Sequence, residues 1–210
     1  MSEVTNLVRM DLWKIASLGK NLAVYVVVLL VFFQFQMGLV APVLLLYLTT
    51  YILAYYDEQS KGVCLTGTLP VTRTQQVQAK YLLDLAVLAA ALALGAAAFW
   101  VGQLLGIGGG QPPEQLWLMF VVGAVFIAVA QPMLLLFGPL KARWWIFGFY
   151  FVMFGAVAAL ASLTAEAPAW AWALVGGRLA PALGVALGWA ALLVSYLAAA
   201  RCYRRREFSD

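Results

Sequence analysis

Long apolar segments alternate with short polar ones along almost the whole chain. A helix of about 20 residues crosses a hydrocarbon core of about 30 Å, and six of the apolar segments come near this length. These predicted spans are residues 21–36, 39–56, 81–105, 116–137, 144–165 and 179–200. Only Met37 and Gly38 separate the first two, which predicts a tight helical hairpin. The pattern therefore predicts an all-α integral membrane protein with six transmembrane helices in one domain, residues 1–210.

The composition agrees with this class. The chain has 210 residues, of which 65% are apolar and 10% are charged, whereas a soluble domain has about 25% charged residues. No soluble core could bury this apolar excess, and the length leaves no room for a second globular unit. The net charge of +4 does not indicate nucleic-acid binding, because the basic residues lie where membrane topology requires them.

The distribution of lysine and arginine predicts which side of the membrane each loop occupies, because cytoplasmic loops carry an excess of these residues. Every lysine and arginine except Arg178 falls on one side of the predicted spans. These residues occupy segments 1–20, 57–80, 138–143 and 201–210. Both termini are therefore predicted to be cytoplasmic. On the outer side, residues 166–178 have an apolar middle that is too short to cross the membrane, which predicts a re-entrant or interfacial segment.

Residues 1–20 have the pattern of an amphipathic helix that lies along a membrane surface. The apolar residues that recur at helical spacing are Val4, Leu7, Val8, Leu12 and Ile15. Arg9, Asp11 and Lys14 are expected to lie largely away from this face, and Trp13 suits the interface. The alternative is a cytoplasmic extension of the first span.

The longest polar stretch that cannot lie in a membrane is residues 57–80. Asp57 and Glu58 favour the start of a short helix, because the helix dipole stabilises acids there. Pro70 ends such a helix, since the residue before a proline avoids the α region, and Thr72 can cap the next helix. The stretch therefore predicts a short cytoplasmic helix held between two transmembrane helices. An ordinary polar loop that contains a proline is the alternative.

The chain has few residues of the kinds that form catalytic, metal or cofactor sites. It has no histidine, and Cys64 and Cys202 both fall on the predicted cytoplasmic side, where thiols stay reduced. Gly62 and Gly67 have the spacing of a phosphate-binding loop, but the lysine that would reach the phosphates is missing and no strand is predicted before them. We therefore expect no catalytic site, no metal site and no cofactor bound by this chain.

Asp84 is the one ionisable residue within a predicted span, where such groups are costly and often functional. It follows Lys80 by four residues, so the two side chains share a helix face. One interpretation is a carboxylate at the membrane boundary that pairs with Lys80 or Arg73. The other is a proton relay.

Small residues indicate where helices approach each other closely. Residues 81–105 are rich in alanine with Gly95 near the middle, so this span is expected to face other helices. Gly184 and Gly188 form a GxxxG motif, which predicts close packing either within the subunit or between subunits. Trp189 lies in the middle of its span and is expected to pack against another helix.

The residues around the central polar stretch resemble those of a known family. Tyr56-Asp57-Glu58 closes the second span, Leu69-Pro70-Val71-Thr72-Arg73 follows, and Lys80-Tyr81 opens the third. Together with the amphipathic start, the hairpin of the first two spans and the basic tail, these segments resemble the membrane subunit of ABC-2-type ATP-binding-cassette transporters. The similar branch is the short, six-span bacterial permease that lacks its own ATPase domain.

The resemblance implies a transmembrane permease subunit of an ATP-driven exporter in the bacterial plasma membrane, which moves an amphipathic or hydrophobic substrate such as a peptide. It implies a cytoplasmic ATPase partner, which binds ATP and magnesium, and a second permease copy or paralogue. The loop between the second and third spans would be a coupling helix held by the ATPase, and the N-terminal helix a connecting helix that also touches it. The alternatives are an ATP-independent membrane carrier and a non-transporting scaffold or sensor.

The resemblance also implies which residues contact the ATPase. In the coupling segment these are Asp57, Glu58, Lys61, Leu65, Leu69, Pro70 and Arg73. In the connecting helix they are Leu7, Leu12, Trp13 and Ile15.

Overall fold

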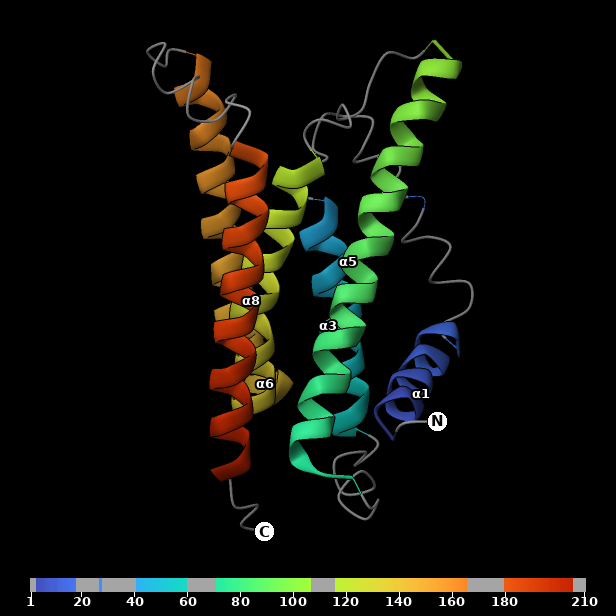
Figure 1. Cartoon of the computed structure of the whole chain (residues 1–210), viewed down its shortest axis with the longest axis vertical. Helices are drawn as coiled ribbons and strands as arrows, with labels where there is room; N and C mark the ends of the chain where they lie inside the picture. The colour runs from blue at the N-terminus through green and yellow to red at the C-terminus, as the bar shows by residue number, and fades with distance from the viewer. Residues whose placement is uncertain are drawn as a thin grey trace.

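The structure is a computed structural model of the chain and describes residues 3–17, 27, 41–59, 71–106, 116–165 and 180–205. Within these ranges there is no strand, and the helices are α1 (Glu3–Ser17), α3 (Ala41–Gln59), α5 (Arg73–Leu104), α6 (Leu116–Ala165) and α8 (Ala180–Arg205). Helices α3, α5, α6 and α8 form a bundle, and α1 packs obliquely against α5 and α3 (Figure 1). The all-α prediction is confirmed for this part of the chain.

One end of the bundle, which we call the basal end, is where α3 ends, α5 begins, α6 bends and α8 ends (Figure 1). Each described lysine or arginine belongs to α1 or lies near the basal end of its helix. These residues are Arg9, Lys14, Arg73, Lys80, Lys141, Arg143, Arg201, Arg204 and Arg205. The described bases are therefore gathered at one end of the molecule.

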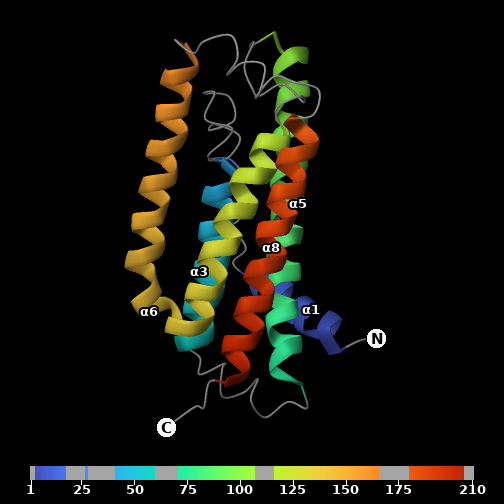
Figure 2. The same ribbon diagram turned by 60° about the vertical axis from the view of Figure 1, so that its left-hand side comes forward.

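Helix α6 bends back on itself at Gly138, where φ is 74° and ψ is 164°. A positive φ suits glycine, which has no Cβ to clash, and Pro139 suits the first turn of the helix that follows. The two arms, residues 116–137 and 139–165, run in opposite directions (Figure 2). The turn predicted at 138–143 is located correctly, but it is shorter than expected because the helix resumes at Pro139.

Three of the described helices are long and apolar enough to cross a membrane: Arg73–Leu104, Leu116–Met153 and Ala180–Arg204. Helix α3 occupies the predicted second span. The predicted first span at 21–36, apart from residue 27, and the predicted outer segment at 166–178 fall outside the described residues.

Thr72 caps the start of α5, as the sequence predicts. Its hydroxyl accepts from the backbone N–H of Gln75 at 3.3 Å, and the Gln75 side chain accepts from the Thr72 N–H at 2.8 Å. This reciprocal arrangement is a capping box. At 1.5 Å per residue, the 32 residues of α5 span about 48 Å, which exceeds a hydrocarbon core of about 30 Å. The first turns of α5 therefore extend beyond the predicted third span.

Small residues of α5 face the rest of the bundle, as predicted. Ala91, Gly95 and Ala98 are buried on one face of the helix. On the facing helix, a Cβ at Gly123 of α6 would clash with the Leu88 side chain of α5. The absence of side-chain bulk therefore lets α5 and α6 approach closely.

The GxxxG motif of α8 packs within the subunit, against the first arm of α6. A Cβ at Gly184 would lie 2.6 Å from the Trp117 ring, and a Cβ at Gly188 would lie 2.9 Å from the Phe120 ring. Trp189 also meets Phe120, with ring centroids 5.6 Å apart. Of the two predicted roles of the motif, the structure supports packing within the subunit.

A hydrogen bond between helices compensates for Pro132, which lies inside the first arm of α6. Proline has no N–H, so the carbonyl of Ala128, four residues earlier, lacks its usual helical donor. The Ser195 hydroxyl of α8 donates to this oxygen at 2.7 Å, and Ser195 Oγ lies 2.7 Å from the Tyr81 hydroxyl of α5. Because a carbonyl within a membrane needs a partner, these contacts connect α8 to both α6 and α5.

Candidate functional site

The buried face of α1 includes an acid. Leu7 and Asp11, one turn apart, turn toward the bundle and are 7% and 2% exposed, whereas Leu12 and Trp13 are exposed. The expectation that Asp11 lies away from the apolar face of α1 is therefore wrong, because Asp11 is buried on the same side of the helix as Leu7. Ion pairs to α3 and α5, which helical periodicity cannot reveal, hold the polar residues against the bundle.

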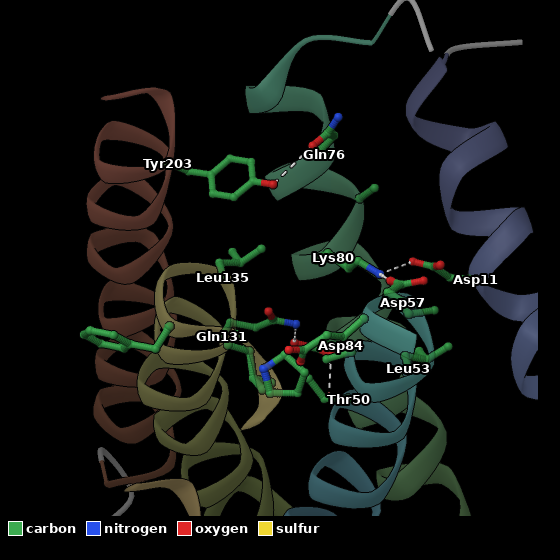
Figure 3. Close-up of a pocket in the computed structure, with 18 of the residues that line it drawn as sticks. Asp11, Thr50, Leu53, Asp57, Gln76, Lys80, Asp84, Gln131, Leu135 and Tyr203 are labelled. Carbon is green, nitrogen blue, oxygen red and sulfur yellow. Dashed lines mark hydrogen bonds and ion pairs between the residues drawn. The ribbon is translucent and has the colours of Figure 1, made fainter. Parts of the chain in front are cut away.

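Four charged side chains meet where α1, α3 and α5 converge, and Figure 3 shows Lys80 beside Asp11 and Asp57. Lys14 Nζ lies 3.1 Å from Asp11 Oδ1 and 2.5 Å from Asp57 Oδ1. Lys80 Nζ lies 2.8 Å from Asp11 Oδ2 and 2.9 Å from Asp57 Oδ2. Each acid therefore contacts both bases, and the charges alternate around a closed ring. We call Asp11, Lys14, Asp57 and Lys80 the ion-pair cluster.

The ion-pair cluster balances charges that would be costly to bury singly. Asp57 lies in the last turn of α3, where the helix dipole disfavours an acid. Burial alone would raise the pKa of Asp57, but the attraction of Lys80 and hydrogen bonds from Lys14 and Lys80 outweigh burial and hold the pKa below its ordinary value of 3.8. Asp57 is therefore ionised at neutral pH, and its ion pairs join helices that are far apart in the sequence.

Asp84 lies one turn further along α5 and is 2% exposed. Its carboxylate accepts hydrogen bonds from the Thr50 hydroxyl of α3, at 2.9 Å, and from the Gln131 amide of α6. No ion pair joins it to Lys80 or Arg73, because the Lys80 ammonium is held by the two acids of the ion-pair cluster. The interpretation of Asp84 as a boundary carboxylate paired with either base is therefore wrong. Its contacts join α3, α5 and α6.

A cavity of about 440 Å³, which we call the basal cavity, lies at the meeting point of the described helices. Asp84 and Gln131 line it together with three members of the ion-pair cluster, Asp11, Asp57 and Lys80 (Figure 3). Apolar side chains form most of the remaining wall; they include Leu53, Leu83, Leu134, Leu135 and Leu140. Tyr203, near the end of α8, completes the lining. The basal cavity therefore combines an apolar wall with a few polar groups.

A comparison with protein-family models identifies the class of the chain. The family described as "ABC-2 family transporter protein" matches residues 6–204. This chain belongs to the ABC-2 transporter family. The resemblance noted in the sequence is confirmed, and the ABC-2 protein is a component of a membrane transport system. Searches of curated proteins and of solved structures find no match.

Three of the predicted coupling residues of the ABC-2 protein are described. Asp57 belongs to the ion-pair cluster, Glu58 is exposed at the edge of the basal cavity, and the Arg73 guanidinium donates to the carbonyl of Arg204 at 3.3 Å. Asp57 and Glu58 lie in the last turn of α3, so the expectation that they start a short helix is wrong. The others, Lys61, Leu65, Leu69 and Pro70, fall outside the described residues.

The predicted connecting residues divide into two groups. Leu7 is buried against the bundle, and Ile15 is half-buried. Leu12 and Trp13 are 47% and 66% exposed. Within α1, the exposed apolar surface available to a membrane or a partner therefore centres on Leu12 and Trp13.

Sequence reasoning missed several residues of the site. Thr50 and Gln131 are polar residues within predicted spans, and this is a usable signal because polar side chains in a membrane hydrogen-bond across helices. The ion-pair cluster left no comparable signal. Lys14 lies 43 residues from Asp57 in the sequence, and spacing within one helix cannot predict such a pair.

Proposed function

We propose that the ABC-2 protein is the transmembrane permease subunit of an ATP-driven exporter in the bacterial plasma membrane. The complete chain would have six spans with both termini in the cytoplasm, and would pair with a second permease copy or paralogue. A separate cytoplasmic ATPase would bind ATP and magnesium and hydrolyse the nucleotide. The substrate would be amphipathic or hydrophobic, a class that includes peptides.

The ion-pair cluster is the observation that carries this proposal. It joins α1, the end of α3 and the start of α5 through charged contacts of 2.5 to 3.1 Å. Residues 60–70 connect α3 to α5 in the sequence, so a partner that grips this segment would act on all three helices at once. A rigid-body push of this kind is an established way to transmit a conformational change.

The distribution of charge supports the proposed orientation. The described lysines and arginines belong to α1 or lie near the basal end, and the positive-inside rule assigns such an end to the cytoplasm. Exposed Leu12 and Trp13 on α1 suit either the membrane surface or a cytoplasmic partner. These features support a proposed ATPase-binding face at the basal end.

Co-purification tests the proposal. An affinity-tagged ABC-2 protein, expressed in its native host and extracted in mild detergent, should recover an ABC ATPase identified by mass spectrometry. Leu65→Glu and Leu69→Glu should remove the ATPase, because each would put a charge into the proposed docking segment. Gln103→Ala is the matched control, because Gln103 is exposed near the far end of α5.

Two outcomes would count against the proposal. Recovery of no ABC ATPase with the unaltered chain would contradict an ATP-driven function. Undiminished recovery with both glutamate variants, at the same yield and melting temperature, would contradict docking at this segment. Transport by the purified chain alone in vesicles would instead support an ATP-independent carrier.

A further inference from the structure

We propose that the basal cavity binds an amphipathic ligand with a protonated amine, whose ammonium contacts Asp84 and whose apolar part lies against the leucine-rich wall. Such a site goes beyond the proposed function, because it lies within a single chain and needs no ATPase. The ligand could be a soluble cationic amphipath or an amine-headed lipid, since both present the same chemistry.

The size and the wall of the basal cavity suit a small ligand. Its volume of about 440 Å³ falls within the range of about 300 to 1,000 Å³ that is typical of small-molecule sites. Leu53, Leu83 and Leu134 present apolar surface and are 2%, 2% and 7% exposed. Such sites combine apolar walls with a few polar groups that fix the orientation of the ligand, and this cavity has that composition.

The charges that line the basal cavity are unevenly balanced. Two lining acids, Asp11 and Asp57, are matched by Lys80 in the lining and by Lys14 outside it. Glu58 and Lys141 are exposed at the edge of the cavity, where water stabilises both. Asp84 is buried, and no lysine or arginine among the described residues forms an ion pair with it. Asp84 is therefore the acid in the buried part of the described lining that has no ion-pair partner.

The hydrogen bonds of Asp84 leave room for a further donor. An ionised carboxylate has about four lone-pair positions, and the Thr50 hydroxyl and the Gln131 amide occupy one on each oxygen. These two donors fix the carboxylate at the cavity wall, where Figure 3 shows it between them. A buried carboxylate without a cation is costly, and an ammonium would remove much of that cost.

An anionic ligand fits this cavity less well. Lys80 is already held by two carboxylates, and Lys141 is exposed at the edge. An anion in the cavity would therefore face Asp84 and Glu58 without a buried base to offset them. A neutral ligand would gain the apolar contacts only.

Three matched probes test the proposal: 4-phenylbutylamine, 4-phenyl-1-butanol and 4-phenylbutyrate, which share one apolar body. Calorimetric titration of the purified chain in phosphatidylcholine nanodiscs at pH 7.5, without ATPase, should show the amine binding at least about tenfold more tightly than the alcohol. The acid should bind most weakly. Equal affinity for amine and alcohol, tighter binding of the acid, or no binding of any probe at millimolar concentration would overturn the proposal.

Two variants locate the site. Asp84→Asn should weaken amine binding about tenfold and leave alcohol binding nearly unchanged, because only the charge is removed. Glu3→Gln removes an equal charge from the exposed start of α1 and should change neither. Ala54→Phe places a ring into the lining and should weaken the binding of both the amine and the alcohol. It replaces Asp84→Asn as the test if that variant does not fold. Unchanged amine binding in a folded Asp84→Asn or Ala54→Phe variant would overturn the assignment.

A last comparison identifies the source of the ligand. If phosphatidylethanolamine in the nanodiscs weakens the binding of 4-phenylbutylamine, the lipid occupies the site. If its affinity is unchanged, the site takes a soluble amine. Both results support an amine site, and because neither uses the ATPase, a failure of the binding assay would leave the docking proposal intact.

Discussion

The two ends of the bundle hold their helices together in different ways. At the basal end, the ion-pair cluster and the bonds of Asp84 join α1, α3, α5 and α6. Polar contacts also join α5 to α8 there, between Gln76 and Tyr203 at 3.4 Å and between Gln78 and Tyr196 at 3.0 Å. Toward the opposite end, α8 meets the first arm of α6 through glycines placed against aromatic rings.

This difference suggests a division of work. Lipid is as apolar as leucine, so helices in a membrane associate through close packing and hydrogen bonds rather than through a hydrophobic driving force. The glycine contacts depend on shape and fix α8 against α6. The basal contacts depend on charge and link α3 and α5, which residues 60–70 connect, to the rest of the bundle. We call the region where Gly184 and Gly188 meet Trp117 and Phe120 the packed half. If the proposed partner grips residues 60–70, its motion would enter at the basal end, and the packed half would resist it.

The largest effect is expected from breaking the ion-pair cluster with Lys80→Met. This change leaves buried Asp11 and part-buried Asp57 with Lys14 as their remaining base, and breaking a buried ion pair costs about 3–5 kcal/mol. The free energy of unfolding, measured by denaturant titration in detergent, should fall by an amount in this range.

Two variants control for Lys80→Met. Lys141→Met removes an exposed lysine and should have little effect. Adding Asp11→Asn to Lys80→Met should recover part of the loss, because one acid then faces one base. Equal stability of Lys80→Met and Lys141→Met would show that the cluster does not stabilise the basal end.

The next largest effect is expected in the packed half, from Gly184→Leu. A Cβ at this position would lie 2.6 Å from the Trp117 ring, and overpacking a well-packed interface costs about 1–3 kcal/mol. The melting temperature in detergent should fall. Gly148→Leu is the matched control, because no described residue lies within 4 Å of a Cβ there. Equal losses of stability in the two variants would show that close steric fit does not stabilise the interface between α6 and α8.

The two regions also differ in how far the sequence predicts them. The packed half follows from local patterns. Gly184 and Gly188 are visible as a motif. At the basal end, Gly138-Pro139 also marks the bend of α6, because glycine accepts the positive φ that the bend requires. Thr72 is similarly recognisable as a cap. Each of these features depends on residues that lie within a few positions of one another.

The basal end could be predicted only in part. The charge distribution identified the end itself, but Asp11 was assigned to the wrong face of α1, and its partner Lys80 lies 69 residues away. Lys80 was assigned to Asp84 because the two share a helix face, whereas acids on two other helices hold it in the structure. Local spacing lists the available partners, and tertiary packing selects among them.

A smaller effect is expected where the two regions meet, from Ser195→Ala. This change removes the donor to the Ala128 carbonyl, which Pro132 leaves without its usual helical bond. Hydrogen bonds between membrane helices contribute about 1 kcal/mol, so the free energy of unfolding should fall by about that amount. Thr49→Val is the control, because among the described residues the Thr49 hydroxyl bonds only carbonyls of its own helix. A loss of stability no larger than that of Thr49→Val would show that the hydrogen bond from Ser195 to Ala128 does not stabilise the fold.

The smallest expected effect is a dependence of stability on pH that originates in the ion-pair cluster. The pKa of Asp57 is lower in the folded protein than its ordinary value of 3.8. The ionised carboxylate therefore stabilises the fold above that value, and this stabilisation is lost as the pH falls through the folded pKa. Melting temperatures measured between pH 7 and pH 3 should decline more steeply for the unaltered chain than for Asp57→Asn, which cannot titrate at this position. Parallel declines would show that protonation of Asp57 does not loosen the basal end.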